Sequence, residues 1–557
     1  MEKTITNISI IVFIVLLFFT RTLLFVNSYG ALEHDSGWNL GLAKNLSQRG
    51  IYASYTNTNI KDGNSNFENI HRRFSLQDEN GFTYFPAAVG VGPGYIVPQS
   101  LMLKIFGNGW WQYRTWPLLG FILLLSISFF IVRKYGGVVG LLFFSVWLWI
   151  VPQFTIQMAY EALSEHIALL YLLAGYLSLY FFDSIKKLWL PFLSGLMFSL
   201  SFLTKTIFIL PIIGSIVYLQ CDYFRFEKAR KLMFKKWLIF FFGLLIPILA
   251  FNIYKHDYLN SHFGEKGLNA QRQEQRLVFS QSGSGADPAG FIFQSRDFLS
   301  QKLSVWSDVG IRVPIFIWVC LLLSPIIFIK YPSGSGKIFL TSLYFAALVS
   351  FIWYLFFSPD GWGRHIWQGL FIGILLISIS LGLLFAQIAA KYRVLFLTLL
   401  VPICLFLVNF PVVNAAFIFD QSIIANWATV RKSRGLDGFP TNPILSLQDQ
   451  KELVNFFSQN IKSDDRVYYL LGFLNAEISP LVDKVFYSIE RYVSDGQKNP
   501  DGGKAILIIG PYQQGIWSDR PENYVSEVKA NICNQILFQN PSYLLCTIKS
   551  DLFNTSN

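Results

Sequence analysis

The sequence predicts an α-helical protein that crosses the membrane many times and ends in a small α/β domain. Three observations predict this class. Of the 557 residues, 53% are hydrophobic and 17% are aromatic, whereas only 14% are charged, which lies outside the range of soluble domains. Apolar runs of spanning length recur up to residue 418. From Asp420 onward these long runs stop, and shorter strand-like segments follow.

The apolar runs predict about eleven transmembrane helices. The first run, Ile8 to Val26, is longer than the apolar part of a signal peptide and lacks a small-residue cleavage site, so we expect a retained helix. The other runs are of spanning length or slightly shorter, and they lie at residues 115–132, 137–152, 166–182, 188–204, 206–220, 237–254, 311–329, 338–357, 366–386 and 394–418.

Cations in the short loops predict the orientation. They gather in alternate loops, at residues 133–134, 186–187, 225–236, 330–337 and 391–393. Because cytoplasmic loops carry the excess of lysine and arginine, these loops are expected to be cytoplasmic. The net charge of +11 is then explained by a cationic inner face against anionic membrane lipid, and it requires no nucleic-acid partner.

We expect a transmembrane domain over residues 1–418, with extracytoplasmic loops at 29–112 and 255–310, and an extracytoplasmic α/β domain over residues 419–557. The polar loop 255–310 would cover a binding site or act as a tether. The α/β domain is expected to contain a helix at 447–461 and strands at 467–471, 484–489, 505–509, 535–538 and 543–548.

Two of the five cysteines lie in the expected α/β domain. Cys533 and Cys546 flank the turn at Asn540 and Pro541. If their strands are adjacent, their Cα atoms would approach within about 7 Å, the limit for a disulfide. Such a bridge would suit an oxidising compartment.

The loop after the first helix carries the most informative residues. Glu33 and Asp35 follow the first apolar run, and residues 36–46 place Trp38, Leu42 and Leu46 on one stripe. That spacing predicts an amphipathic helix that lies in the membrane interface. Further on, the sequence Gly-Pro-Gly-Tyr at 92–95 opens a second apolar segment.

This loop resembles the GT-C superfamily of membrane glycosyltransferases. The shared features are an acid after the first helix, an amphipathic segment that ends in Gly-x-Tyr at 50–52, and Pro-Gly-Tyr at 93–95 opening a segment that closes on Phe-Gly at 106–107. The sequence is similar to the bacterial branch that contains lipopolysaccharide-core sugar transferases, the lipid A aminoarabinose transferase and the protein O-mannosyltransferases. The resemblance extends to Glu165, to residues 203–205 and 364–365, and to the terminal domain.

The resemblance implies an enzyme of the cell membrane, a hexosyl- or pentosyltransferase of the inverting type. It would move a sugar from a polyprenyl-phosphate donor to a glycolipid, cell-envelope glycan or protein acceptor at the outer face. By the same resemblance, Asp35 matches the loop aspartate near the acceptor. The sequence departs from the family at two places. Position 36 is often acidic in the family and is Ser36 here, and Val91 and Gly92 stand where some relatives carry a lysine. The donor phosphate therefore needs another cation.

Transfer of a sugar from a phosphate needs a base for the acceptor hydroxyl and a cation for the departing phosphate. Asp35 is the candidate base, and Glu33 is a second candidate or a metal ligand. The alternative is that both acids end the first helix in water. No metal-ligand spacing among the cysteines, Gly-rich phosphate loop or nucleotide-binding fingerprint appears, so the sequence identifies no certain cofactor, and assistance by a divalent cation stays open.

Five further residues are candidate substrate-binding residues, and four of them have an alternative. Lys205 interrupts an apolar stretch and would bind the phosphate, or its ammonium reaches the membrane surface. Arg364 and His365 would bind the anionic headgroup, or they anchor an aromatic belt. Glu165 would orient the acceptor or the sugar, or it complements a helix dipole. Tyr95, which opens the second apolar segment, is the fifth candidate.

A transporter or flippase of a lipid-linked glycan is the rival function. A transporter would place polar residues near the middle of the bilayer in broken helices, whereas here they gather beside the long loops. A non-catalytic scaffold would leave the residues around Asp35 unexplained.

Overall fold

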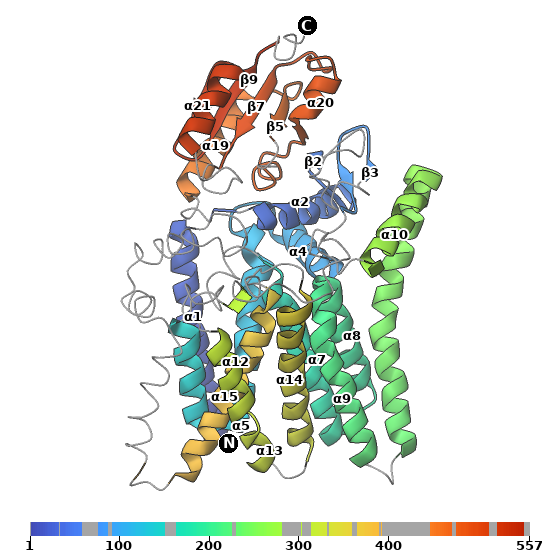
Figure 1. Ribbon diagram of the computed structural model, residues 1–557, viewed down its shortest axis with the longest axis vertical. Helices are drawn as coiled ribbons and strands as arrows, with labels where there is room; N and C mark the ends of the chain where they lie inside the picture. The colour runs from blue at the N-terminus through green and yellow to red at the C-terminus, as the bar shows by residue number, and fades with distance from the viewer. Residues whose placement is uncertain are drawn as a thin grey trace.

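The structure is a computed structural model that describes residues 2–29, 31–32, 34–57, 76–86, 92–150, 163–225, 230–280, 302–303, 313–330, 334–358, 365–388, 392, 446–470, 475–511 and 521–550. A bundle of helices occupies one end of the long axis, and an α/β part built around a sheet occupies the other (Figure 1). The first loop, residues 29–112, carries helices α2 (His34–Arg49) and α4 (Pro93–Phe106) between these two parts (Figure 1).

The predicted apolar runs are helical wherever the structure describes them. The bundle contains α1 (Glu2–Tyr29), α5 (Thr115–Ile150), α7 (Glu165–Ile185), α8 (Trp189–Thr204), α9 (Ile209–Arg225), α10 (Arg230–Ser280), α12 (Val313–Leu323), α13 (Ile326–Lys330), α14 (Ser335–Ile352) and α15 (Trp367–Gln387). Short helical turns lie at η1 (Gln112–Arg114), η3 (Thr206–Phe208) and η6 (Trp353–Phe357). The run at 394–418 lies outside the described residues.

Five helices in the described part of the chain are long and apolar enough to cross a membrane, and four apolar helices there are shorter. The five are Gln112–Trp149, Glu165–Ile185, Lys231–Gln273, Ser335–Phe356 and Trp367–Gln387. The predicted class, a membrane protein, is therefore confirmed, while the number of eleven spans stays a prediction.

Helix α15 forms the centre of the bundle, with 83% of its most apolar window buried. It crosses α5 closely, because a Cβ at Gly136 would lie only 2.9 Å from the Cα of Ile379, and a Cβ at Gly382 would overlap the Gly136 carbonyl. Small residues of this kind let two helix backbones touch in a membrane. Gly137, with φ 69° and ψ −161°, divides α5 into the two helices that the sequence predicts.

The expectation of a polar loop over 255–310 is wrong for residues 255–280. Helix α10 continues to Ser280, with a kink at Gly264, where φ is 56° and ψ is −140°. Beyond the kink the chain folds back, since a Cβ at Gly267 would approach the Leu259 carbonyl at 2.5 Å. The hydropathy signal ends near 254, but helix-forming residues continue past it, and Leu259 is buried at 2% exposure.

The predicted interfacial helix at 36–46 forms as α2, but its expected polar face is buried. Every residue from Ser36 to Asn45 is buried. One face of α2 packs against α4, and Gly37 packs against the backbone of Glu477 in the α/β part. Two of its polar side chains have partners within the protein: Asn45 Nδ2 donates to the Ala53 carbonyl at 2.7 Å, and Lys44 Nζ donates to the Pro480 carbonyl at 2.7 Å.

The α/β part forms where the sequence predicts strands. Its six-stranded sheet has the order β2-β6-β5-β7-β9-β8, with β5 parallel to β6 and β7, and β9 antiparallel to β7 and β8. The strands are β2 (Thr56–Asn57), β5 (Arg466–Tyr469), β6 (Phe486–Ser488), β7 (Ala505–Ile509), β8 (Cys533–Gln539) and β9 (Leu544–Ile548). Helices α19 (Leu447–Asn460), α20 (Ile489–Ser494) and α21 (Pro521–Asn531) accompany them. The domain boundary near 419 lies outside the described residues and stays a prediction.

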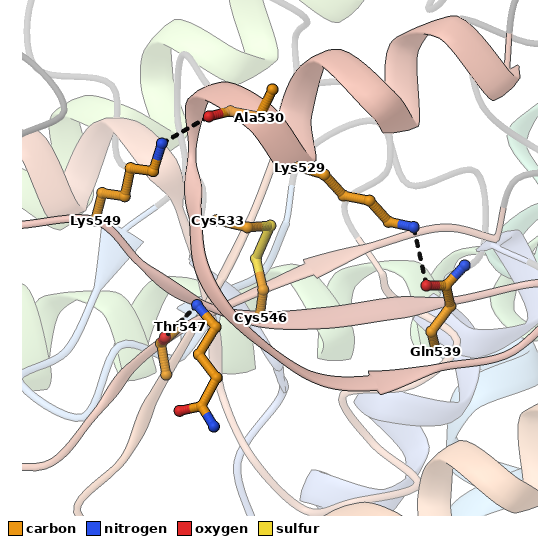
Figure 2. Close-up of a disulfide and its surroundings, with 8 residues drawn as sticks. Lys529, Ala530, Cys533, Gln539, Cys546, Thr547 and Lys549 are labelled. Atoms are coloured by element: carbon orange, nitrogen blue, oxygen red, sulfur yellow. Dashed lines mark hydrogen bonds between the residues drawn. A yellow bond between two sulfur atoms is a disulfide. The ribbon is translucent and has the colours of Figure 1, made fainter.

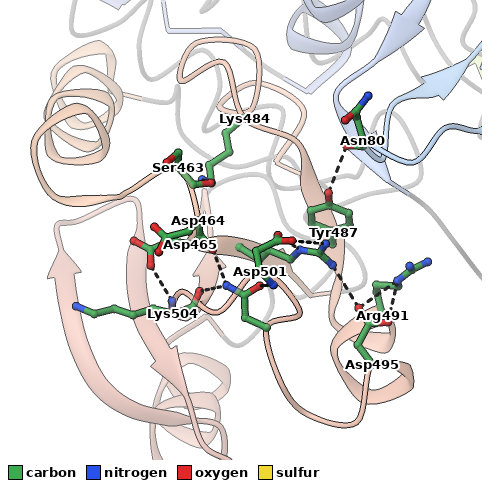
Figure 3. A network of polar contacts seen from close by, with 12 residues as sticks. Asn80, Ser463, Asp464, Asp465, Lys484, Tyr487, Arg491, Asp495, Asp501 and Lys504 are labelled. Carbon is green, nitrogen blue, oxygen red and sulfur yellow. Dashed lines mark hydrogen bonds and ion pairs between the residues drawn. The ribbon is translucent and has the colours of Figure 1, made fainter.

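The sheet also contains a strand that the sequence does not predict. Strand β2 belongs to the first loop and pairs parallel to β6, with Thr56 opposite Phe486. The rest of the first loop forms a small sheet of β1 (Ala53–Ser54), β4 (Thr83–Tyr84) and β3 (Leu76–Gln77). Tyr487 of β6 also donates to the Asn80 carbonyl at 3.3 Å (Figure 3). The first loop and the α/β part therefore share hydrogen bonds.

A disulfide and an ionic network link elements of the α/β part. Cys533 and Cys546 form the predicted disulfide between β8 and β9, with their Cα atoms 5.5 Å apart (Figure 2). Arg466, at the start of β5, pairs with Asp501 at 2.5 Å and with Asp495 at 3.4 Å (Figure 3). This second network lies at the amino ends of β5 and β7.

Candidate active site

The first loop places the candidate base at a helix start. Asp35 lies in the first turn of α2, while Glu33 and Arg364 lie outside the described residues. Gln450 of α19 fixes the chain just before this turn, because its side chain accepts from the Leu32 N–H at 2.8 Å and donates to the Leu32 carbonyl at 2.9 Å. The entry to α2 is therefore held by the α/β part.

Helix α4 brings the first loop against the bundle. Its N-cap, Gly92, donates its backbone N–H to the Thr204 carbonyl at 3.0 Å, and a Cβ at Gly92 would overlap the Leu203 carbonyl. A Cβ at Gly94 would lie 2.9 Å from the Thr204 nitrogen. The two glycines flanking Pro93 are therefore required because the first turn of α4 touches the last turn of α8.

Lys205 directly follows this contact. It has extended backbone between α8 and η3, with φ −151° and ψ 119°. Its ammonium forms an ion pair with Glu165, the first residue of α7. Both side chains are buried, at 11% and 1% exposure. A charged pair in such surroundings is costly to desolvate, so its retention points to a role beyond stability.

Tyr95 and Arg114 complete the cluster around this pair. Tyr95, in the first turn of α4, is 1% exposed and interacts electrostatically with both Arg114 and Glu165. Arg114, at the end of η1, is also 1% exposed and donates to the Ala31 carbonyl at 3.0 Å. The structure therefore brings together Lys205, Glu165 and Tyr95, three residues that the sequence predicts to bind substrate. Arg114 links this cluster to the chain just before Asp35.

His365 lies beside η6. It precedes α15 and packs its ring near that of Trp353 in η6, with centroids 6.0 Å apart. Gln368 donates to its backbone carbonyl at 2.9 Å. The contact with Trp353 is of the kind that the alternative, an aromatic anchor, expects. His166, next to Glu165, donates its Nε2–H to the Pro117 carbonyl at 2.8 Å, inside the bundle.

Among the described residues, several buried cations were not recognised in the sequence, and three of them lie in or beside the bundle. Arg114 is one, and Arg21 of α1 is another, at 3% exposure and 2.6 Å from the Trp149 carbonyl. Lys302 is the third, and it donates to the carbonyls of Tyr354 and Ser358 at 2.9 and 2.5 Å. For Arg21 and Arg114, the available signal was an ionisable residue in or next to an apolar run, which is expensive in a membrane.

A buried carboxyl group lies where α2 meets the α/β part. Glu477 is fully buried, and its Oε1 atom accepts from the hydroxyl of Tyr543 at 3.5 Å. Burial raises the pKa of Glu477 from 4.5 to about 8. Glu477 is therefore a mostly neutral side chain at neutral pH.

We expect Glu477→Gln to flatten the dependence of stability on pH. The folded protein keeps this proton up to about pH 8, whereas the unfolded chain loses it near 4.5, so wild-type stability should fall as pH rises between these values. Glutamine has no proton to lose, so the variant should keep its unfolding midpoint above pH 8. Thermal unfolding from pH 5 to pH 9 measures this, with Glu452→Gln on the exposed side of α19 as the control. Parallel profiles for wild type and Glu477→Gln would contradict the assignment.

No cluster of three or more metal-binding side chains occurs among the described residues. A cavity of about 480 Å³ opens between the two halves of α10, lined by both apolar and polar side chains. They are Leu249, Asn252, Ile253, His256, Asp257, Leu268, Gln271 and Arg272.

The fold and the cluster together define a multi-helix membrane protein whose first loop joins the bundle to an α/β part. No protein-family model matches the sequence, and no curated protein matches it. Among solved structures, the chain is similar to ArnT from Cupriavidus metallidurans bound to undecaprenyl phosphate, with a TM-score of 0.57, and to the same protein in the apo state, with a TM-score of 0.55. Each comparison has 10% sequence identity and covers 98% of this chain and 98% of the other. This likeness confirms the predicted resemblance at the level of the fold.

Proposed function

We propose that this protein is an integral-membrane glycosyltransferase that moves a sugar from a polyprenyl-phosphate donor to an acceptor at the extracytoplasmic face. The observation that carries the proposal is the buried pair of Lys205 and Glu165, set against α4 and linked by Arg114 to the chain before Asp35. A structure with the same fold binds undecaprenyl phosphate, which supports a donor of this class.

The proposed reaction assigns a role to each residue of the cluster. The acceptor oxygen attacks the anomeric carbon of the sugar, its proton passes to Asp35, and the bond between that carbon and the phosphate oxygen breaks. Polyprenyl phosphate leaves with the bonding electrons, and the charge on Lys205 stabilises it. Glu165 orients the ammonium of Lys205. Attack from the side opposite the phosphate inverts the anomeric centre.

Two observations support the extracytoplasmic side. The short loops rich in lysine and arginine lie on the opposite side from the first loop under the expected orientation. The disulfide between Cys533 and Cys546 suits an oxidising compartment. Donor binding by Arg364 and His365, and a glycolipid, cell-envelope glycan or protein as the acceptor, belong to the same proposal.

Analysis of cell-envelope glycans tests the function. A strain that lacks the gene should lose one sugar from an envelope glycan or glycoprotein and should accumulate the sugar-loaded polyprenyl phosphate. The wild-type gene should restore the sugar. Envelope glycans of unchanged mass in the deletion strain would contradict the proposal.

A further inference from the structure

The α/β part contacts α2 along its length. Residues 476–483, here called the clamp, follow β5 and run beside one face of the helix. Gly37 touches Glu477, and a Cβ at Gly41 would lie 3.8 Å from Pro480. Lys44 donates to the Pro480 carbonyl at 2.7 Å. Positions 37, 41 and 44 share one helix face, so the clamp covers a continuous stripe of α2.

The clamp ends in an ionic contact with three separate donors of the first loop. Asp483 accepts from Arg49 Nη2 at 3.1 and 3.2 Å and from the hydroxyl of Tyr55 at 2.5 Å. Lys44 Nζ lies 3.3 Å from Asp483 Oδ1. Lys44 is only 5% exposed, so this contact includes a cation that has been withdrawn from water.

The charge on Asp483 is maintained by its partners. Burial alone would raise the pKa of Asp483, but hydrogen bonds from Arg49 and Tyr55 and the charge of Lys44 outweigh it and lower the pKa to about 2. The backbone of Asp483 has φ 54°, in the left-handed region that aspartate tolerates better than most residues. A residue kept in such a conformation by three contacts has a defined position.

We propose that Asp483 is a positioning residue that, through the clamp, fixes the orientation of α2 and so the place of Asp35 in the transferase site. Helix α2 lies between α4 on one face and the clamp on another, so its first turn cannot shift while both contacts remain. Precise placement of a base strongly affects reaction rate. The inference rests on the proposed function for its rate effect, whereas its effect on α2 is independent of that function.

Asp483→Asn tests the proposal, with Asp501→Asn as a matched control. Asp501 also pairs with an arginine, at 2.5 Å, but this arginine, Arg466, belongs to the α/β part and not to the first loop. We expect Asp483→Asn to lower kcat about three- to tenfold while the donor KM changes less than about twofold. Asp483→Glu should recover part of the rate. Equal kcat in Asp483→Asn, Asp501→Asn and wild type would overturn the proposal.

Hydrogen exchange gives a readout that needs no enzymatic activity. The backbone amides of residues 34–49 should exchange faster in Asp483→Asn than in wild type or Asp501→Asn. Lys44→Gln, which removes the cation that α2 contributes to this contact, should have the same effect. Unchanged exchange in both variants would overturn the positioning role. Faster exchange in an otherwise folded protein, together with a wild type that transfers no sugar, would leave the positioning of α2 intact and contradict the proposed function instead.

Discussion

Asp35→Asn is expected to lower the rate of sugar transfer by about 10²-fold or more. Asparagine keeps the size and most of the hydrogen-bonding capacity of aspartate, but it cannot take the proton of the acceptor hydroxyl. The change lies in the first turn of α2, whose position is fixed by α4 and the clamp, so the fold should be unaffected. The transfer rate at saturating donor, with protein levels matched, is the measurement.

Two further variants serve as controls for Asp35→Asn. Asp78→Asn removes another carboxylate from the first loop, one that accepts from the Phe82 N–H at 2.9 Å, and it should leave the rate within a few-fold of wild type. Glu33→Gln tests the second candidate. Near-normal transfer by Asp35→Asn together with a large loss in Glu33→Gln would move the role of base to Glu33. Near-normal transfer by both variants would contradict the mechanism.

Lys205→Gln is expected to weaken donor binding about tenfold to a hundredfold. A charge-assisted contact to phosphate contributes roughly 1.5 to 3 kcal/mol, and glutamine leaves the anion partly desolvated without its partner. Acceptor affinity should stay nearly constant, because the acceptor does not contact the Lys205 ammonium in the proposed site. Arg364→Gln should act in the same direction. Titration with a polyprenyl-phosphate sugar measures the effect.

Lys236→Gln is the matched control. Lys236 is also a buried lysine paired with an acid, with its Nζ 3.2 Å from Asp183, but it lies before the apolar stretch of α10 and far along the chain from α4. Its replacement leaves Asp183 without a cationic partner and should lower stability while donor affinity stays unchanged. Equal losses of donor affinity in Lys205→Gln and Lys236→Gln would mean that both act through the fold. Unchanged affinity in Lys205→Gln would place the phosphate elsewhere.

The features that could be predicted from the sequence are those with a local pattern. Apolar length predicts the helices, alternation predicts β5 to β9, and the turn at Asn540 and Pro541 predicts the bridge between Cys533 and Cys546. The glycines at 92 and 94 were recognised as part of a motif. Their physical reason, contact with Leu203 and Thr204, appears only when α4 and α8 are packed.

The features that could not be predicted depend on pairs distant in sequence. The partner of Lys205 is 40 residues away, and Asp483 is 434 residues from Arg49. Hydrophobic spacing predicts that α2 is amphipathic, but residues of the α/β part cover it at Gly37, Gly41 and Lys44, which no local pattern indicates. Strand β2 has only two residues, too few for an alternating signal.

The most direct test is the fate of the bond between sugar and phosphate. The purified protein in vesicles would be given a polyprenyl-phosphate sugar labelled in the sugar, with an envelope extract from the deletion strain as the source of acceptor. The account predicts that label moves to the extract, that one free polyprenyl phosphate appears for each sugar transferred, and that Asp35→Asn abolishes both. Label that stays on the lipid phosphate while the lipid crosses to the other leaflet would contradict the account and identify a transporter.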